Sequence, residues 1–329
     1  MNILIVRVSS LGDVVHNMPM LADLRRHVPG AQIDWVVEES YASLVRLNDS
    51  VRQVIPFALR RWRKSLGSAA TRAEMRAFRN ALRATAYDLV FDTQGLIKTG
   101  LVMRMARLAP GGRRIGLANA TEGSGYEPLS RLFHTTSVPV APRTHAVQRA
   151  RDVAAAALGY RADGPADFNL QAPALQPAWL PAQPYAVFFH GTARAAKQWP
   201  EAHWITLGRQ LVARGLALLL PWGSAAEHAA AQRIAAGVPG AQVLPALPLM
   251  EAVTLAQRAT LAVGVDTGLT HIAAAFERPT VELYCDSPRW KTEGNWSPRI
   301  VNLGDAGAPP AVAEVEAAAF ALLDQHALG

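Results

Sequence analysis

The stretch 261–275 constrains the fold of this 329-residue chain more than any other. It begins with five apolar residues, 261–265, which have the length and composition of a buried parallel strand. The run breaks at Asp266-Thr267-Gly268 and resumes as a helical pattern of small residues. A strand, a tight turn and a helix start in this order predict an α/β unit whose first helical amides face an anion. The alternative is an ordinary capped helix start, with Asp266 or Thr267 as the N-cap.

Strand and helix patterns alternate along the rest of the chain as well. In the first half, apolar runs typical of buried strands occur at 2–8, 32–39, 51–57 and 88–92. In the second half they recur at 185–190, 216–220, 242–244 and 280–284. Helical patterns separate these runs, so each half is expected to be a parallel sheet covered by helices. Sheets of this kind bind their ligands beyond the carboxyl ends of the strands.

A proline-rich segment separates the two halves. Residues 163–184 lose periodicity and contain five prolines, a composition typical of a linker. We therefore predict an α/β fold of two Rossmann-like, doubly wound domains that face each other across a cleft. The predicted parts are an N-terminal domain at 1–165, a linker at 166–184, a C-terminal domain at 185–310 and a closing helix at 311–329.

Charge and cysteine content limit the partners and the compartment. A net charge of +7 and a pI of about 10.0 indicate an anionic partner, such as nucleic acid, a membrane surface or a phosphorylated small molecule. The chain has one cysteine, Cys285, so no disulfide framework is expected and a reducing compartment is the default. The N-terminal segment is charged too soon for a signal peptide, and no apolar stretch is long enough to span a bilayer. These features predict a soluble cytoplasmic protein.

The first half offers an acid and a group of cations at predicted strand ends. Asp13 stands at the start of a helix, where it is either a general base facing the cleft or a first-turn acid that suits the helix dipole. Lys98 lies in the first turn of another helix, which is unfavourable for a cation unless an anion binds nearby. Four more cations surround Trp62 and form either a solvated loop or a docking site for phosphate or carboxylate. They are Arg60, Arg61, Arg63 and Lys64.

The turns of the second half supply groups that suit a nucleotide sugar. They are Thr192, Lys197, Glu227, Asp266, Thr267, Gly268 and His271. A lysine and two helix starts can hold a phosphate, and the Glu227 carboxylate suits sugar or ribose hydroxyls. The alternatives are a surface role for Lys197, a packing role for His271 and a helix-start role for Glu227. With an acceptor site in one half and a donor site in the other, this arrangement describes a nucleotide-sugar transferase.

Several motifs together resemble one known family. They are Ser9-Ser-Leu-Gly-Asp13, Asp34-Trp-Val-Val-Glu-Glu39, Arg60-Arg-Trp-Arg-Lys64, Asp92-Thr-Gln-Gly-Leu-Ile-Lys98, the segment 197–204, Leu220-Pro-Trp-Gly223 and the segment 265–271. Over nearly its whole length the chain resembles the lipopolysaccharide heptosyltransferases, which are inverting glycosyltransferases of the GT-B architecture. The resemblance implies transfer of L-glycero-D-manno-heptose from its ADP derivative to the first Kdo sugar of Kdo2-lipid A. The motifs at 34–39 and 60–64 favour members that add the first heptose over members that add a later sugar.

The resemblance also implies roles for individual residues. Asp13 matches the base of the family, and the seven second-half residues named above match its donor-binding positions. The cations at 60–64 and Lys98 are expected to bind the acceptor. Where the family often has two consecutive threonines, this chain has Thr192-Ala193, and the segment 111–125, which we expect to be mobile, has no clear match. The closing helix of GT-B enzymes crosses back to the first domain, which is the expectation for 311–329.

The resemblance and the composition also bear on cofactors and location. The chain contains no Asp-x-Asp pair, so neither a metal clamp nor any other cofactor is expected. The positive charge and the lipid acceptor together predict peripheral contact with the anionic cytoplasmic face of the inner membrane.

Two other classes of protein fit the sequence less well. A non-enzymatic nucleotide- or nucleic-acid-binding protein would explain the high pI. However, aromatic residues are only 7% of the chain and no nucleic-acid motif is present, so no nucleic-acid partner is expected. A nicotinamide-dependent oxidoreductase is disfavoured because the loop 9–13 contains one glycine and lacks the G-x-G-x-x-G fingerprint.

Overall fold

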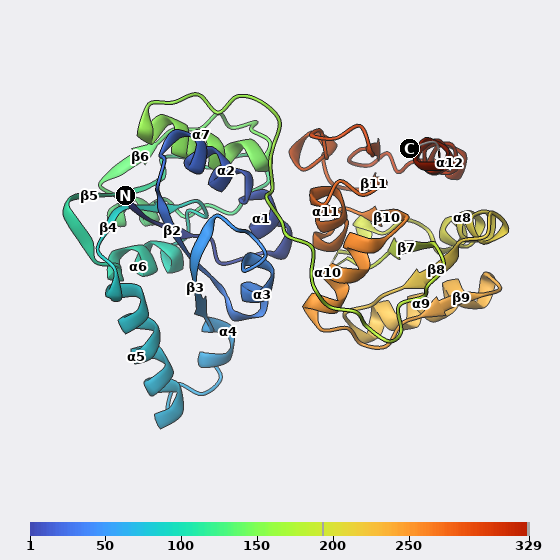
Figure 1. Cartoon of the computed structure of the whole chain (residues 1–329), viewed down its shortest axis with the longest axis horizontal. Helices are drawn as coiled ribbons and strands as arrows, with labels where there is room; N and C mark the ends of the chain where they lie inside the picture. Colours follow the sequence, from blue (N-terminus) through green and yellow to red (C-terminus); the bar gives the residue numbers. More distant parts are fainter. Residues whose placement is uncertain (193, 328–329) are drawn as a thin grey trace. The chain divides into compact units, whose positions relative to one another are not determined.

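The computed structural model describes residues 1–192 and 194–327. Ala193, which replaces the second threonine of the family motif, lies outside the described residues. The chain forms two compact units, Met1–Gln171 and Ala172–Gly329 (Figure 1). The division between them falls within the proline-rich segment 166–184.

The first unit is built on a six-stranded parallel sheet in the order β3-β2-β1-β4-β5-β6. Its strands are β1 Asn2–Val6, β2 Gln32–Glu38, β3 Val51–Phe57, β4 Tyr87–Asp92, β5 Leu108–Leu117 and β6 Thr136–Val138. This is the doubly wound order, in which the connections run outward in opposite directions from β1 and β4. The βα turns therefore diverge at the carboxyl ends of these two central strands, where such folds bind ligands.

Helices cover the first sheet and bury its apolar strands. They are α1 Leu11–His16, α2 Pro19–His27, α3 Ala42–Val45, α4 Leu59–Trp62, α5 Ala69–Ala84, α6 Ile97–Met105 and α7 Ala146–Leu158, with 3-10 turns η1 Glu39–Tyr41 and η2 Pro128–Phe133. Residues 3–6 of β1 are completely buried, as expected of a strand that helices cover on both faces.

The second unit repeats this topology in a sheet ordered β12-β11-β10-β7-β8-β9. Its strands are β7 Tyr185–Phe189, β8 Ala217–Leu220, β9 Ala241–Val243, β10 Leu261–Val265, β11 Thr280–Tyr284 and β12 Ile300–Gly304. Its helices are α8 Glu201–Ala213, α9 Ala225–Gly237, α10 Leu249–Arg258, α11 Gly268–Ala275 and α12 Val312–Ala327, with 3-10 turns η3 Ala195–Lys197 and η4 Arg289–Lys291. In this sheet β7 and β10 are the central pair.

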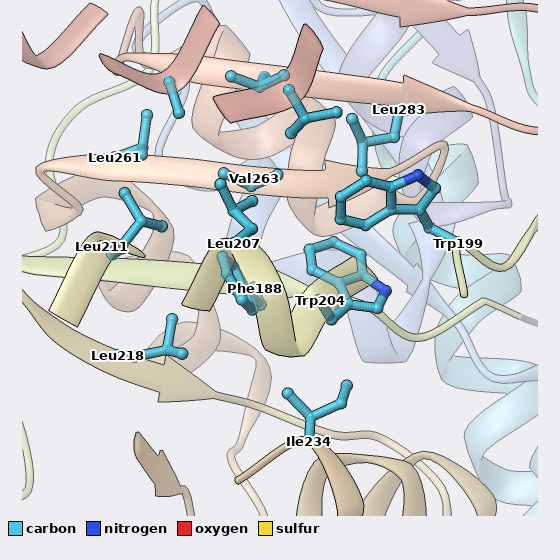
Figure 2. Close-up of a cluster of buried hydrophobic side chains, with 14 of the residues drawn as sticks. Phe188, Trp199, Trp204, Leu207, Leu211, Leu218, Ile234, Leu261, Val263 and Leu283 are labelled. Carbon is cyan, nitrogen blue, oxygen red and sulfur yellow. The ribbon is translucent and has the colours of Figure 1, made fainter. Parts of the chain in front are cut away.

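The core of the second unit forms where α8 and the closing helix α12 pack on the sheet. Trp199 and Trp204 meet edge to face, with ring centroids 5.0 Å apart (Figure 2). From α12, Val315, Ala319 and Leu322 are buried in the same cluster. The closing helix α12 therefore packs on α8 and the second sheet, and its crossing to the first unit stays a prediction.

The structure differs from the sequence predictions in three places. The helix expected to start at Asp13 is divided into two helices, α1 and α2, and Pro19 takes the first helical position of α2, where its missing N–H costs nothing. The segment 111–125, predicted to be mobile, begins inside β5. There Gly111 has a φ of +76°, and a Cβ on Gly112 would lie 2.7 Å from the Tyr87 carbonyl oxygen, so both glycines serve the irregular pairing with β4. The edge strands β6 and β12 were not predicted.

Candidate active site

In the second unit, three neighbouring strands place their turns at one edge of the sheet. β10, β7 and β8 lie side by side and are parallel, so their carboxyl ends meet. The turn after β7 leads to Lys197, the turn after β8 leads to α9 with Glu227, and β10 leads through Asp266 into α11. The fold therefore gathers the predicted donor residues at the edge where doubly wound sheets bind ligands.

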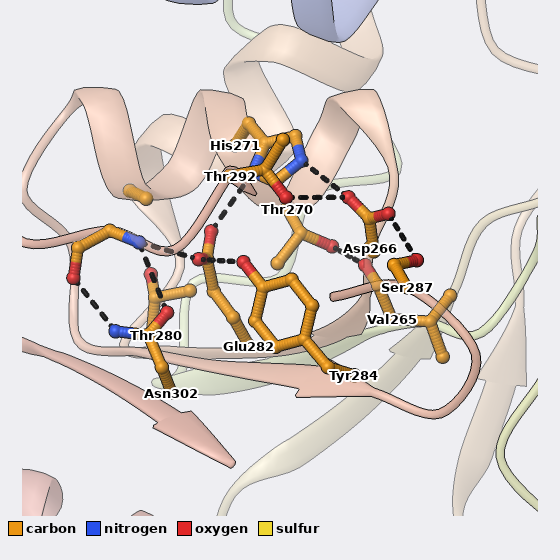
Figure 3. A network of polar contacts seen from close by, with 12 residues as sticks. Val265, Asp266, Thr270, His271, Thr280, Glu282, Tyr284, Ser287, Thr292 and Asn302 are labelled. Atoms are coloured by element: carbon orange, nitrogen blue, oxygen red, sulfur yellow. Dashed lines mark hydrogen bonds and ion pairs between the residues drawn. The ribbon is translucent and has the colours of Figure 1, made fainter. Parts of the chain in front are cut away.

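Asp266 is the centre of a polar network at this edge (Figure 3). Its Oδ2 accepts hydrogen bonds from Lys197 Nζ at 2.5 Å and Ser287 Oγ at 2.6 Å, and its Oδ1 lies 3.0 Å from His271 Nε2. Burial raises the pKa of Asp266, but His271 and Lys197 outweigh burial and hold this pKa well below its usual range. The structure thus brings three predicted donor residues, Lys197, Asp266 and His271, into direct contact.

His271 lies between two carboxylates in the interior. Its Nε2 faces Asp266, its Nδ1 lies 3.1 Å from Glu282 Oε1, and its side chain is almost completely buried. Carboxylates only accept hydrogen bonds when ionised, so both ring nitrogens donate when the imidazole carries two protons. Burial lowers the pKa of His271, but Glu282 and Asp266 outweigh it and raise the pKa to about 10. The histidine is therefore a buried cation at neutral pH.

The start of α11 provides backbone donors beside this network. Thr267 is the N-cap residue in an extended conformation, and in the described part of the chain its side chain makes no capping hydrogen bond. Thr270 Oγ1 donates to the Val265 carbonyl at 2.8 Å, and a Cβ on Gly264 would lie 2.0 Å from that hydroxyl. The first-turn amides after Thr267 and Gly268 therefore remain for a ligand, and they suit a phosphate.

Glu227 lies against the turn that follows β7. A Cβ on Gly191 would lie 2.5 Å from the Glu227 carboxyl carbon, so the carboxylate occupies the space that this glycine leaves beside Thr192. The Gly223 amide donates to Glu227 Oε2 at 2.7 Å, and the Glu227 amide donates to the N-cap hydroxyl of Ser224 at 3.3 Å. Glu227 thus both supports the start of α9 and presents a carboxylate where β7 and β8 end.

In the first unit, Asp13 is held by two arginines and by its own N-cap residue. Arg7 Nη2 lies 2.6 Å and Arg149 Nη2 3.9 Å from Asp13 Oδ1, while the amide and hydroxyl of Ser10 donate to Oδ2 at 3.0 and 2.8 Å. Burial raises the pKa of Asp13, but Arg7, Ser10 and Arg149 outweigh burial and keep this pKa well below its usual range. The side chain is 36% exposed, so an ionised carboxylate is accessible at the start of α1.

Two of the cations around Trp62, Arg60 and Arg61, lie on the short helix α4, which the tryptophan anchors, and Arg63 and Lys64 follow it. Trp62 is buried against Phe57 and Phe78, and its Nε1 donates to Glu74 Oε2 at 2.8 Å. Arg61 makes a two-pronged pair with Glu39, at 3.0 and 2.9 Å, and also pairs with Glu74 at 2.8 Å. Arg61 therefore ties α4 to η1 and α5, and its contact with an acceptor stays a prediction.

Lys98 lies within electrostatic range of Arg60 and Arg63. Burial and then Arg60 lower the pKa of Lys98, Arg63 adds to this, and Glu38 and Glu127 act in the opposite direction. Arg60 and Arg63 thus lie close enough to Lys98 to lower its pKa, and a bound anion would relieve this repulsion. Lys64 is exposed beside them, just after α4.

The sequence analysis did not predict three residues of the candidate site, namely Arg7 and Arg149 near Asp13 and Glu282 near His271. Arg7 follows β1 and reads as part of a strand, while Arg149 lies within α7, so neither position signals a link to Asp13. Glu282 could have been predicted from the sequence, because a lone acid within the apolar strand 280–284 needs a buried partner.

No group of three or more His, Cys, Asp or Glu side chains suited to a metal occurs within 1–192 and 194–327. Over the same ranges, no helix combines the length and hydropathy needed to cross a bilayer.

Two doubly wound units of this kind form the GT-B fold of glycosyltransferases. A family model for glycosyltransferase family 9 (heptosyltransferase) matches residues 75–318. The chain belongs to this family and is a heptosyltransferase. It is 43% identical over 285 residues to lipopolysaccharide heptosyltransferase 1 of Pseudomonas aeruginosa, covering 86% of this chain and 78% of that protein.

Two further comparisons narrow the resemblance within the family. Lipopolysaccharide heptosyltransferase 2 of Escherichia coli is 26% identical over 319 residues, covering 92% of this chain and 88% of that protein. The solved structure of E. coli heptosyltransferase WaaC with ADP matches with a TM-score of 0.82 and 35% identity, covering 99% of both chains. The chain is therefore more similar to a first heptosyltransferase than to a second one.

Proposed function

We propose that this enzyme transfers L-glycero-D-manno-heptose from ADP-heptose to the first Kdo of Kdo2-lipid A, with inversion at the anomeric carbon. The Lys197–Asp266–His271 network at the start of α11 carries the proposal, because it places a cation beside the first-turn amides of a helix, which suit a diphosphate. The WaaC structures with ADP and with ADP-2-deoxy-2-fluoro heptose, each 35% identical to this chain, support an ADP-sugar as the donor. The higher identity to heptosyltransferase 1 favours the first heptose over the second.

Different donor residues bind different parts of the nucleotide sugar. Lys197 and the amides after Thr267 and Gly268 bind the diphosphate and stabilise the charge that develops on ADP as the sugar–phosphate bond breaks. The Thr192 hydroxyl donates a hydrogen bond to the departing phosphate, and the Glu227 carboxylate accepts hydrogen bonds from sugar or ribose hydroxyls. Lys197 is paired with Asp266 in the ligand-free protein, so diphosphate binding requires it to exchange one anionic partner for another.

Asp13 acts as the general base in this proposal. The acceptor hydroxyl attacks the anomeric carbon on the face opposite ADP, its proton passes to Asp13, and ADP leaves with the electrons of the broken bond. This single displacement inverts the anomeric centre. Help from a positioned base contributes roughly 10²- to 10⁴-fold to the rate. The low pKa of Asp13 keeps it ionised but makes it a weak base, so the proton moves late, when the hydroxyl has become acidic.

The cations of the first unit bind the acceptor. Kdo carries a carboxylate and lipid A carries phosphates, which are groups that arginine holds in two-pronged fashion. We assign them to Arg60, Arg61, Arg63, Lys64 and Lys98. The repulsion of Lys98 by Arg60 and Arg63, which lowers the pKa of the lysine, favours this assignment.

We place the enzyme peripherally on the cytoplasmic face of the inner membrane. Leu101 on α6 and Leu129 and Leu132 on η2 are 50%, 61% and 78% exposed, and α6 packs against η2. Side chains three residues apart in a 3-10 helix point the same way, so the two η2 leucines form one apolar face. The exposed cations Arg104 and Arg131 lie on the same two elements, and an apolar face bordered by cations suits an anionic bilayer.

Mass spectrometry of Kdo2-lipid A after incubation with ADP-heptose and the purified enzyme, with EDTA present, tests the proposal. A gain of one heptose is expected, with no need for an added metal or other cofactor. A gain only on an acceptor that already carries one heptose would move the enzyme to the second step. Activity that returns only with a divalent metal would contradict the metal-independent mechanism.

A further inference from the structure

Glu282 is a completely buried acid that the proposed mechanism does not yet use. It lies in the middle of β11, one strand away from the donor turn of β10. Its Oε2 accepts hydrogen bonds from the Tyr284 hydroxyl and the Gly294 amide, each at 2.9 Å, and its Oε1 faces His271 Nδ1 at 3.1 Å (Figure 3). Burying a carboxylate is costly, even with partners, and an apolar residue of similar volume would pack there with less penalty.

The contacts of Glu282 begin a line of alternating charge that ends at the donor site. Glu282 faces His271 at 3.1 Å, His271 faces Asp266 at 3.0 Å, and Asp266 faces Lys197 at 2.5 Å. Along this line, exposure of the side chain rises from 0% for Glu282 to 19% for Lys197. The buried acid is thus linked, through one histidine and one aspartate, to the lysine that would meet a diphosphate.

This line decides how firmly Asp266 holds Lys197. With Glu282 and a cationic His271 in place, the two carboxylates are balanced by two cations, and Asp266 shares its charge between His271 and Lys197. If His271 lost its second proton, Lys197 would be the main partner of Asp266. An incoming diphosphate would then have to take the lysine away from a carboxylate with no other cation beside it, which weakens binding.

We propose that Glu282 is a positioning residue for the donor, which holds His271 against Asp266 and so lets Lys197 turn to the diphosphate of an ADP-sugar. This inference rests on the proposed function, because it assigns the diphosphate to Lys197. Glu282 itself touches no substrate in this scheme. Its effect reaches the ligand through His271 and Asp266, while Tyr284 and Gly294 fix its carboxylate.

The test compares three variants on strand β11 with the wild-type protein. E282Q removes the negative charge with little change in volume, E282D keeps the charge on a shorter side chain, and V281A removes two buried methyl groups from the neighbouring position outside the network. Calorimetry measures ADP affinity, and ¹⁵N NMR of labelled histidine measures the protonation of His271 in the ligand-free protein. Thermal melting reports the stability of each variant.

We expect E282Q to weaken ADP binding about 10- to 100-fold, the equivalent of one charge-assisted hydrogen bond, and to leave His271 with one ring proton at neutral pH. V281A should melt at lower temperature but bind ADP as wild type does, with His271 still doubly protonated. E282D should fall between wild type and E282Q, and it carries the test if E282Q does not fold.

Two results would overturn the inference. One is a folded E282Q that binds ADP with wild-type affinity or, if E282Q does not fold, an E282D whose His271 has lost its second proton and which still binds ADP with wild-type affinity. The other is an equal loss of ADP affinity in V281A, which would mean that packing rather than charge is responsible. Wild-type protein that fails to bind ADP would instead overturn the proposed donor site. The histidine spectra of wild type and E282Q would then still decide whether Glu282 keeps His271 protonated.

Discussion

Replacing Arg7 with methionine tests whether the environment of Asp13 sets the pH range of catalysis. The Arg7 guanidinium lies 2.6 Å from Asp13, is 5% exposed and is the nearer of two arginines at this carboxylate. Methionine removes the charge while keeping most of the apolar stem of the side chain. Burial, which raises the pKa of Asp13, is then opposed mainly by Ser10 and Arg149.

The size of the effect follows from the distance between the two charges. An opposite charge this close lowers a carboxyl pKa by about 1 to 3. Loss of Arg7 should therefore raise the pKa of Asp13 by a similar amount, toward the ordinary value of 3.8. A base must be ionised to accept a proton, so activity is lost as the pH falls through this pKa. The acid limb of the pH profile should move upward in Arg7→Met.

The assay is the initial rate of ADP release between about pH 3.5 and pH 9 at limiting acceptor, where kcat/KM reports groups of the free enzyme. Wild type and Arg7→Lys, which keeps the positive charge, should show no acid limb from Asp13 in this range. Arg7→Met should lose a larger share of its rate at the acid end than at the alkaline end. An unchanged profile shape in Arg7→Met would refute the assignment of Asp13 as the base or of Arg7 as the group that depresses its pKa.

Three more changes have defined outcomes. Lys197→Met should raise the calorimetric Kd for ADP about 10- to 100-fold, and an unchanged Kd would remove the lysine from the diphosphate site. Gly264→Ala should lower the melting temperature by the equivalent of about 1–3 kcal/mol, because the new methyl would collide with Thr270 Oγ1; wild-type stability would mean that α11 can shift to accommodate it. Replacing Leu129 and Leu132 together with serine should reduce co-sedimentation with phosphatidylglycerol vesicles but not transfer to a water-soluble, deacylated acceptor, and wild-type sedimentation would exclude this face from membrane contact.

The fold was most predictable where strands are buried on both faces. Apolar runs such as 2–6 and 261–265 can be predicted as strands without knowing which strands they pair with, because burial on both faces accounts for their composition. β5 was missed because it contains Ala-Pro-Gly-Gly-Arg-Arg, and its pairing with β4 depends on an irregular register that only the folded sheet supplies. The short strands β6 and β12 lie at sheet edges, where half of the apolar signal is absent.

The residues of the candidate site that directly follow strands could be predicted from the sequence, because the order of strands and helices places these turns at one edge of the sheet. Lys197 and Asp266 are 69 residues apart but follow neighbouring strands, so the alternation of strands and helices was enough to bring them together. Asp13 was visible because it starts a helix, whereas Arg7 and Arg149 become its partners only through tertiary packing. The same limit applies to Arg61, whose two acidic partners lie on other elements and could not be inferred from a run of cations.

Both units share one strand order, so the central strands of each sheet lead to the proposed site while the segments farther out border it. In each sheet the two innermost strands lead to residues of the proposed site: β1 and β4 precede Asp13 and the acceptor cation Lys98, and β7 and β10 precede Lys197 and Asp266. Glu227 follows β8, the next strand along the second sheet. The segments beyond the outer strands, such as η2 after β5, border these positions without forming them. Such segments can lengthen, shorten or change composition while the reacting groups stay where the sheet holds them. Enzymes with this fold can therefore change acceptor specificity through these outer segments, while the residues proposed for transfer keep their positions.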